Sequence, residues 1–264
     1  MADPQLVDPH TYPGRPWPLS SLTVAFTDKY LKRSYRLLQR NLDPDNVFFL
    51  GDLFDGGREW ATTAKGFQSS EQQWEKYGAE FWLNEYNRFG KIFFAPDQVS
   101  GGLPVTKAKK TIASLPGNHD LGFGNGIQKQ VRDRFRAYFG NSDRVDVVGN
   151  HTFVSLDTVS LSAMGQPDAD ESLWNGTVAF LEQAQELKMK AVREALNMHD
   201  DPAEHTKHPH GVATMEDASK KGSKSKKSKH SGKPELPTIV LTHVPLYREP
   251  GTLCGPLRER YPPR

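Results

Sequence analysis

Three short apolar runs in this sequence each end in polar residues of the kinds that bind metal ions. These polar residues are Asp52 and Asp55 after positions 47–50, Asn118, His119 and Asp120 after positions 111–115, and His243 after positions 238–241. Asp3 and Gln5 add a carboxylate and an amide near the start of the chain. Such ligands suit Mn²⁺, Fe, Zn²⁺ or Mg²⁺, and two such ions about 3.5–4 Å apart can clamp a phosphoryl oxygen. The pattern therefore predicts a metal centre.

Each of these residues alone also has an ordinary structural explanation. Asp52 and Asn118 follow glycines and could be turn residues, because Asp and Asn bond their own backbone in turns. His243 could be a histidine of the core or its rim, and Asp3 lies where a chain end frays. The joint pattern favours the metal site, since acid, amide and imidazole groups each follow a strand-like run. In this interpretation Asp52 bridges both ions, and neutral Asn118 adds no negative charge where a phosphate must enter.

The elements that must position these residues follow from the spacing of apolar side chains. Helices are predicted at 22–41, 74–94, 128–139 and 178–198, and strands at 47–50, 111–115, 145–148, 152–156 and 238–241. The first twenty residues contain five prolines and indicate an extended loop. Strands that alternate with helices predict an α/β fold, in which functional residues lie at strand ends.

Composition limits the classes of protein that this chain can belong to. The 264 residues are 36% hydrophobic and 25% charged, which excludes a membrane-embedded channel and a fully disordered chain. One cysteine, Cys254, excludes an internal disulfide framework and a cysteine-rich zinc site. Without the seven lysines between Lys220 and Lys233, the formal net charge falls from +2 to −5. Bulk composition therefore gives no case for a nucleic-acid binder.

A stretch from about 199 to 237 breaks the alternation of helices and strands. It has almost no large apolar residues, so burial cannot offset the entropy of ordering it. We interpret it as a disordered, lysine-rich insertion within a single domain that covers 1–264, because a strand resumes after it. Its lysines could contact anionic lipid or nucleic acid, but a solvated low-complexity loop is the favoured interpretation.

The motifs Gly51-Asp52, Gly117-Asn118-His119-Asp120 and His243, in that order, resemble the calcineurin-like metallophosphoesterase superfamily. Longer stretches such as DPQLVDPHTYPGRP, LDPDNVFFLGDLFDGGREW and SLPGNHDLGFG resemble its fungal cell division control protein 1 branch. That branch groups with enzymes of the endoplasmic reticulum (ER) that remove ethanolamine phosphate from glycosylphosphatidylinositol (GPI) anchors. The resemblance covers about residues 2–162 and 237–264.

This resemblance implies a fold, a reaction and a set of roles. The fold would be a four-layer αββα sandwich without its C-terminal part. Two divalent ions, Mn most simply and Fe, Zn or Mg as alternatives, would be held by Asp3, Gln5, Asp52, Asn118 and His243. His119 would protonate the leaving oxygen, and Asp120 would orient His119. The substrate would be a GPI-anchor precursor in the ER lumen, with membrane segments outside this chain and no nucleic acid as partner.

Two departures from the superfamily pattern qualify these expectations. The first motif is Asp3-Pro4-Gln5 where the superfamily has Asp-x-His, and no Gly-His-x-His follows His243. We therefore expect a truncated chain that is weakly active or inactive as it stands. Alternatively, it is a catalytically defective scaffold that keeps the fold. A nuclease is disfavoured, because the lysine run has no interleaved aromatic residues on which bases could stack.

Overall fold

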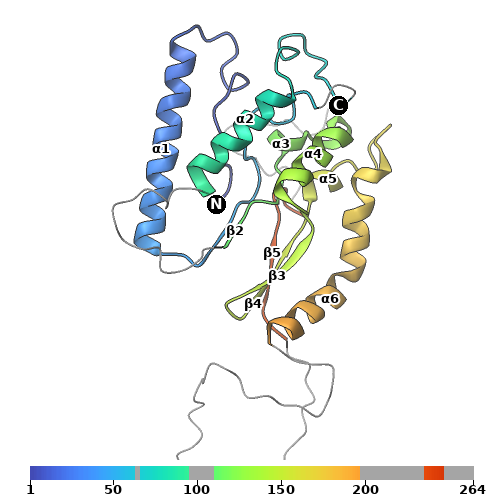
Figure 1. Ribbon diagram of the computed structural model, residues 1–264. Helices are drawn as coiled ribbons and strands as arrows, with labels where there is room; N and C mark the ends of the chain where they lie inside the picture. Colours follow the sequence, from blue (N-terminus) through green and yellow to red (C-terminus); the bar gives the residue numbers. More distant parts are fainter. Residues whose placement is uncertain (63–65, 95–109, 197–234, 247–264) are drawn as a thin grey trace, which may run out of the picture.

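The computed structural model describes residues 1–62, 66–94, 110–196 and 235–246 (Figure 1). The strands within these ranges form two sheets. In the first sheet, β1 (Asn46–Phe48) and β2 (Lys110–Ile112) are parallel. In the second, β4 (His151–Ser155) lies between antiparallel β3 (Arg144–Val148) and parallel β5 (Thr238–Leu241). The strand predicted at 238–241 is thus confirmed, and the mixed α/β content agrees with the predicted sandwich.

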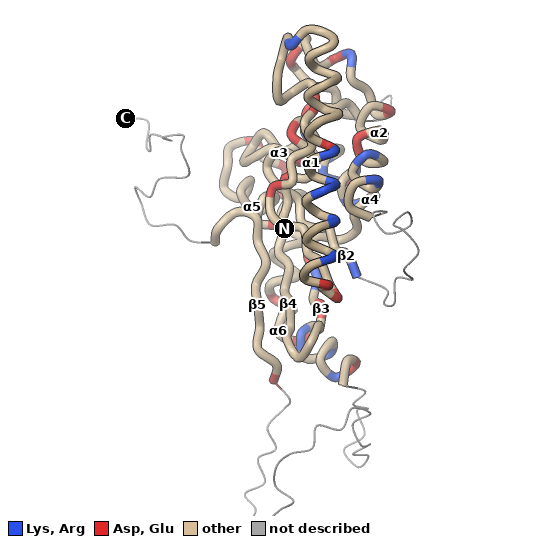
Figure 2. The backbone as a smooth tube through the Cα atoms, turned by 90° about the vertical axis from the view of Figure 1, so that its left-hand side faces the viewer, with Lys and Arg blue, Asp and Glu red and all other residues tan. Residues whose placement is uncertain are grey.

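Helices lie on the outer side of each sheet, so the sheets are sandwiched between them (Figures 1 and 2). The long α1 (Leu19–Leu42) and α2 (Ala79–Phe89) lie beside the first sheet, and α6 (Asn175–Ala195) packs on β3 and β4. The two sheets meet through the stacked rings of Phe48 and Phe153, whose centroids are 4.9 Å apart. The remaining helices are α3 (Asn118–Leu121), α4 (Lys129–Phe139), α5 (Thr158–Leu161), and the short turns η1 (Gly90–Phe94), η2 (Gly124–Gly126) and η3 (Glu171–Leu173).

Aromatic side chains fill the core between α1, α2 and the first sheet. Phe49, directly after β1, packs edge-on against Phe89 of α2 and Phe93 of η1, with centroids 5.3 and 5.1 Å apart. Tyr35 of α1 contacts the same Phe93 at 5.2 Å. Rings of this size dominate core energetics, because each removes about 150–250 Å² from water. The packing fixes the loop that leaves β1, and that loop carries Asp52.

The helix predicted at 74–94 is shorter at its start and changes type at its end. Gly78 has an extended backbone (φ −90°, ψ −171°), so α2 begins only at Ala79. The preceding Trp74 and Tyr77 pack instead on Trp60, with centroids 5.7 and 5.0 Å away. The last turn, Gly90–Phe94, is π-helical. At these positions the tertiary packing of the aromatic rings outweighs the helix propensity of the sequence.

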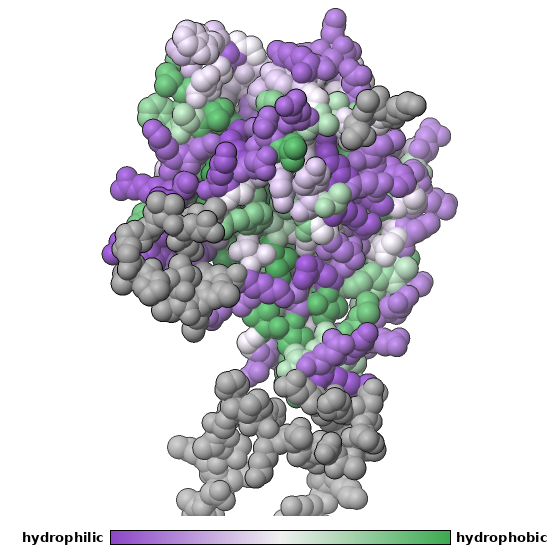
Figure 3. Space-filling model, in the orientation of Figure 1, coloured by the Kyte–Doolittle hydropathy of each residue, from purple (hydrophilic) through white to green (hydrophobic). Residues whose placement is uncertain are grey.

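Most of the predicted insertion at 199–237 lies outside the described residues, as does Cys254. On the face shown in Figure 3, hydrophobic residues reach the surface over the upper part of α1 and over the lower ends of the strands. Among the described residues, no helix is both long enough and apolar enough to cross a membrane.

Candidate metal centre

The chain start runs parallel to the loop that follows β1. The Asp3 amide donates to the Gly51 carbonyl at 3.3 Å, and the Gln5 amide donates to the Asp52 carbonyl at 2.9 Å. Asp3, Gln5 and Asp52 have positive φ angles of 48°, 32° and 50°. Residues other than glycine seldom adopt this left-handed region. The pairing thus brings Asp3 and Gln5 next to Asp52, which is far along the sequence.

Two glycines let the loops after β1 and β2 touch. A Cβ atom at Gly117 would overlap the carboxylate and the backbone nitrogen of Asp52. A Cβ atom at Gly51, where φ is +98°, would lie 2.7 Å from the Gly117 nitrogen and from His243 Nδ1. In this close approach, the His119 backbone N–H donates to Asp52 Oδ1 at 2.8 Å. The position and conformation of Asp52 therefore depend on the absence of side chains at both glycines.

His243 enters the same place from the end of β5. Its Nδ1 donates to the Leu50 carbonyl oxygen at 2.8 Å. A neutral imidazole has one donor and one acceptor nitrogen, so Nε2 presents a lone pair. Nε2 lies 3.2 Å from Asn118 Oδ1 and 3.6 Å from Asp52 Oδ1, which are also acceptors. A histidine that binds a metal usually donates its other N–H to a carbonyl in this way.

The residues predicted as metal ligands therefore lie together. Asp3, Asp52 and His243 each offer a ligand atom, and these three atoms lie within 4.8 Å of one another. Asn118 joins them through His243, and the Gln5 amide nitrogen lies 3.4 Å from Asp52 Oδ2. Acceptor atoms of His243, Asn118 and Asp52 face one another here, and Asp52 is only 5% exposed to solvent. Such facing lone pairs are unfavourable in a buried site, and a bound cation would satisfy them. The carboxylate, amide and imidazole set fits a divalent ion.

A second cluster lies beside the first and consists of His10, Asp55 and His119. His119 Nδ1 donates to the Asp55 backbone oxygen at 2.8 Å and lies 3.3 Å from Asp55 Oδ1. His10 Nδ1 lies 3.1 Å from Asp55 Oδ2. These side chains are close enough to hold an ion. However, the Arg58 guanidinium donates to His10 Nε2 at 3.2 Å and would repel a cation, so the cluster is better described as a hydrogen-bond network.

The network sets the charge of its members. Burial alone would raise the pKa of Asp55, but hydrogen bonds from His10, His119 and Thr11 outweigh it and hold that pKa far below its usual range. In return, the hydrogen bond with Asp55 raises the pKa of His119 against the effect of its own burial. Asp55 therefore stays ionised and favours the protonated form of His119. Because Nδ1 is held by Asp55, Nε2 is the nitrogen that can exchange a proton.

Asp120 has a different place from the one predicted. Its carboxylate accepts hydrogen bonds from the backbone N–H groups of Leu53, Phe54 and Gly117, at 2.8–3.1 Å. Burial, and then the nearby Asp52 carboxylate, raise the pKa of Asp120 to about 7. In the described part of the chain it is Asp55, not Asp120, that holds the His119 ring. The predicted orienting role of Asp120 is thus corrected: it ties the two loops together.

Comparison with protein families gives one decisive match. The description "Calcineurin-like phosphoesterase" covers residues 8–261, nearly the whole chain. The protein belongs to the calcineurin-like phosphoesterase family. Members hydrolyse phosphoesters and typically bind divalent metals, which agrees with the geometry of the site.

Several curated proteins are similar to this calcineurin-like phosphoesterase. Cell division control protein 1 of Saccharomyces cerevisiae is 35% identical over 264 residues, which is the whole chain and 38% of that protein. Metallophosphoesterase 1 of Danio rerio is 25% identical over 237 residues, which is 88% of the chain and 47% of that protein. The Drosophila melanogaster homolog is 29% identical over 164 residues, 62% of the chain and 34% of that protein. The chain spans less than half of each of these relatives, and no solved structure matches it.

The sequence had a signal for the second cluster of this phosphoesterase. The triplet Asp3-Pro4-Gln5 is followed, after two residues, by a similar triplet, Asp8-Pro9-His10, in which histidine takes the third place. Asp8 Oδ2 accepts from the Gly56 N–H at 2.8 Å and fixes the segment that carries His10. Asp55 follows Asp52 by three residues in the same loop. Asp55 is among the polar residues that predicted the metal centre, whereas His10 is not, and the sequence predicts no specific role for either.

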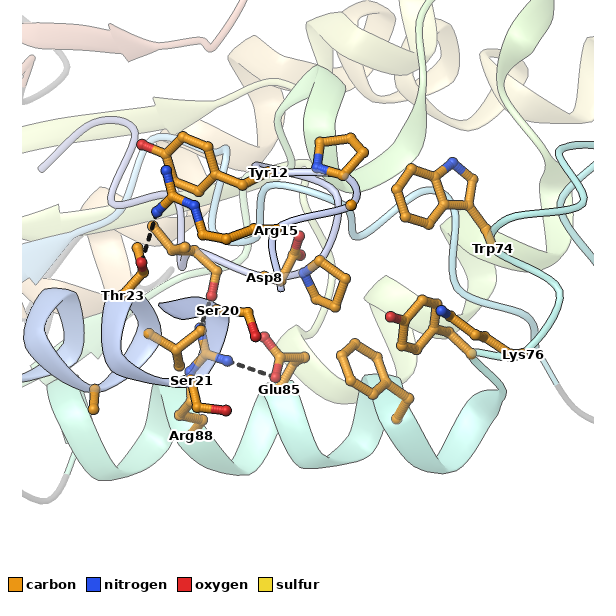
Figure 4. Close-up of a pocket in the computed structure, with 18 of the residues that line it drawn as sticks. Asp8, Tyr12, Arg15, Ser20, Ser21, Thr23, Trp74, Lys76, Glu85 and Arg88 are labelled. Carbon is orange, nitrogen blue, oxygen red and sulfur yellow. Dashed lines mark hydrogen bonds and ion pairs between the residues drawn. The ribbon is translucent and has the colours of Figure 1, made fainter. Parts of the chain in front are cut away.

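A cavity of about 900 Å³ borders the segment that carries His10, because Asp8 and Tyr12 line it (Figure 4). Its walls include Tyr12, Trp74 and Tyr77, and hydroxyl groups of Ser20 and Thr23 line it as well. The Trp74 ring also contacts the His10 ring, with centroids 5.5 Å apart. One aromatic residue thus joins the cavity to the hydrogen-bond network of the site.

Proposed function

We propose that this chain is a phosphodiesterase with two divalent ions, Mn²⁺ being the first choice. Its proposed substrate is the ethanolamine phosphate carried by a mannose of a GPI anchor, in the ER. The observation that carries the proposal is that Asp3, Asp52, Asn118 and His243 converge beside a histidine, His119, that is held by a carboxylate.

Asp52 is the proposed bridging residue, because its two oxygens face different partners. Oδ1 lies on the side of His243, 3.6 Å from Nε2, and Oδ2 lies on the side of Gln5, 3.4 Å from its amide nitrogen. Asn118 and His243 would complete the first position, and Asp3 and Gln5 the second. A divalent cation bound there supplies Lewis-acid chemistry that polarises a phosphoryl oxygen and offsets its charge.

His119 is the proposed general acid. Hydrolysis adds water to phosphorus and breaks the bond to the leaving alkoxide, which must take up a proton. Nε2 of protonated His119 can give that proton, and Asp55 stabilises the imidazolium beforehand. Afterwards water returns a proton to His119. A positioned acid of this kind contributes about 10²–10⁴-fold to the rate.

The substrate and its location rest on resemblance and on the cavity. The long motifs resemble the branch that includes the GPI phosphoesterases of the ER, where we place the catalytic domain in the lumen and its action in GPI remodelling and ER-to-Golgi transport. The aromatic walls and hydroxyl groups of the cavity suit a sugar, which has both apolar faces and hydroxyl groups. Membrane attachment would come from segments outside this chain.

The test measures metal content and turnover on the same purified chain. Elemental analysis after incubation with Mn²⁺ should find bound metal that chelation removes. Hydrolysis of bis-p-nitrophenyl phosphate, and then of a synthetic mannose bearing ethanolamine phosphate, should depend on that metal. Stable metal binding with no turnover on either substrate would favour the scaffold alternative. Turnover on the first substrate alone would overturn the assignment of the GPI glycan.

A further inference from the structure

The outer face of α1 carries a line of exposed apolar side chains. Its members follow one another at helical spacing and are Leu19, Leu22, Phe26, Tyr30 and Leu37; we call them the α1 stripe. Phe26 is 67% exposed and Tyr30 is 70% exposed. Exposed apolar residues on protein surfaces usually occur singly, so a row of them indicates an interaction site. At 100° per residue these positions lie within one sector of the helix. The first four members therefore follow one another turn by turn, and Leu37 lies two turns further along the same side of the helix.

The stripe lies opposite the face by which α1 joins the protein. The buried residues of α1 are Tyr35 and Gln39, about half a helical turn away from the stripe. On that inner side Asp28 forms an ion pair with Arg88 of α2 at 3.2 Å. Figure 2 looks onto α1 and shows it in front of the remaining elements. In the described part of the chain, the apolar residues of the stripe thus add nothing to the core and are open to a partner.

Basic residues accompany the stripe, and acidic residues do not. Lys29, Arg33, Arg36 and Arg40 of α1 lie within or beside the sector of the stripe, whereas Lys32 lies nearer the inner side. Asp28 is the single acid of this helix, and it is engaged on the inner side by Arg88. Trp17, just before α1, is 82% exposed. Aromatic and leucine side chains on one line, with cations beside them, are the pattern of helices that lie in a membrane interface.

We propose that α1 docks on a lipid bilayer that contains anionic lipids, with the α1 stripe entering the headgroup region. Charge complementarity favours this partner, because the cations would contact lipid phosphates while their alkyl stems cover apolar surface. The proposal is independent of the proposed reaction. Docking would nevertheless affect the proposed reaction. Ser20, Thr23 and Val24 of the same helix line the cavity described above, so docking would bring that cavity close to the headgroup layer.

The test uses the whole 264-residue chain and sedimentation with vesicles. Vesicles of phosphatidylcholine alone are compared with vesicles of phosphatidylcholine and phosphatidylserine. The stripe variant is Phe26→Ser/Tyr30→Ser/Leu37→Ser. Its matched control, Met164→Ser/Leu181→Ser, removes apolar side chains that are 59% and 44% exposed elsewhere. A further variant changes the seven lysines from Lys220 to Lys233 to Gln, because that run could also attract anionic lipid.

We expect the wild type to bind the phosphatidylserine vesicles and to release them as salt rises. The stripe variant should partition at least about 100-fold less, since three large apolar groups no longer enter the interface. The control and the lysine-run variant should bind within about threefold of the wild type. Binding that persists in the stripe variant, or that is lost only in the lysine-run variant, would overturn the proposal.

A second measurement separates bilayer docking from self-association. A polarity-sensitive fluorophore is attached through Phe26→Cys in a Cys254→Ser background, and in the control through Met164→Cys in the same background. Vesicles should shift the emission of the first label to the blue and leave the second label unchanged. Sedimentation velocity without lipid should show one species for both wild type and stripe variant. A dimer that only the stripe variant loses, with no blue shift on vesicles, would mean that a second copy covers α1.

Discussion

Replacing Asp55 by asparagine tests the hydrogen-bond network that holds His119. Asn has the shape of Asp but no charge, so Asp55→Asn removes the anion 3.3 Å from His119 Nδ1. It does not remove the backbone carbonyl of the same residue, which accepts from Nδ1 at 2.8 Å. The ring should therefore keep its orientation and tautomer and lose only the stabilisation of its protonated form.

The size of the effect follows from that difference. A hydrogen bond to a charged group contributes about 1.5–3 kcal/mol, and each 1.4 kcal/mol is about tenfold in rate. We expect Asp55→Asn to lower turnover about 10–100-fold on substrates whose leaving group must be protonated. The loss should stay below that of His119→Ala, which removes the acid altogether and should cost about 10²–10⁴-fold.

The assay compares leaving groups in the presence of Mn²⁺. An alkyl phosphodiester needs a proton on its leaving oxygen, whereas p-nitrophenolate leaves without one. Asp55→Asn should therefore slow the alkyl ester strongly and bis-p-nitrophenyl phosphate little, with metal content unchanged. His10→Ala is the matched control, because it also removes a contact to Asp55 but should not change this dependence on the leaving group.

Two results would refute the reasoning. If Asp55→Asn slows both esters equally and lowers the metal content, then Asp55 is a ligand, and the cluster with His10 and His119 holds an ion. If Asp55→Asn lowers the rate as much in a His119→Ala background as in the wild type, then Asp55 does not act through His119, because residues of one unit are not additive.

Three other predictions test the loops and the core. Gly117→Ala forces a Cβ into Asp52 and should weaken Mn²⁺ binding at least about 10–100-fold in calorimetry; an unchanged affinity would contradict the described loop contact. Asp52→Asn should lower phosphodiesterase turnover more than Gln5→Ala does, and equal losses would count against Asp52 as the bridge. Burial raises the pKa of Glu85 from 4.5 to about 7, so the folded state holds an extra proton in that window and the free energy of unfolding falls as pH rises through it. Glu85→Gln should flatten that decline, by up to about 3 kcal/mol between pH 5 and 8 in urea denaturation; an unchanged slope would place the titration elsewhere.

Local patterns predicted much of the fold because they depend on neighbours in the sequence. The apolar run before Gly51 and the one before His243 both end in loops that carry site residues, as alternation of strands and polar turns requires. The helix predicted at 22–41 ends at Leu42, and Asp43 after it adopts φ 41°, since a residue that precedes a proline is disfavoured in the helical conformation. Such features depend on residues that are close in the sequence and not on contacts with distant segments.

The remaining features depend on contacts between distant segments. The sequence offers no rule by which residues 3–6 pair with the loop after β1, because that pairing is a few hydrogen bonds between irregular segments. Asp120 follows His119 directly, which suggested that it orients the ring. Yet its carboxylate accepts from the buried N–H groups of Leu53 and Phe54, which need an acceptor.

The left-handed backbone at Asp3, Gln5 and Asp52 lowers the stability of the fold at the three positions that are proposed to supply metal ligands. Each such conformation costs of order 1–3 kcal/mol for a residue with a side chain, and glycine would adopt it without that cost. A library of variants sorted only for folding should therefore enrich glycine at positions 3, 5 and 52. Sorted for phosphoester turnover, the same library should keep an oxygen ligand there. Positions at which the two selections enrich different residues would then identify the metal centre. The selection for folding would need no metal.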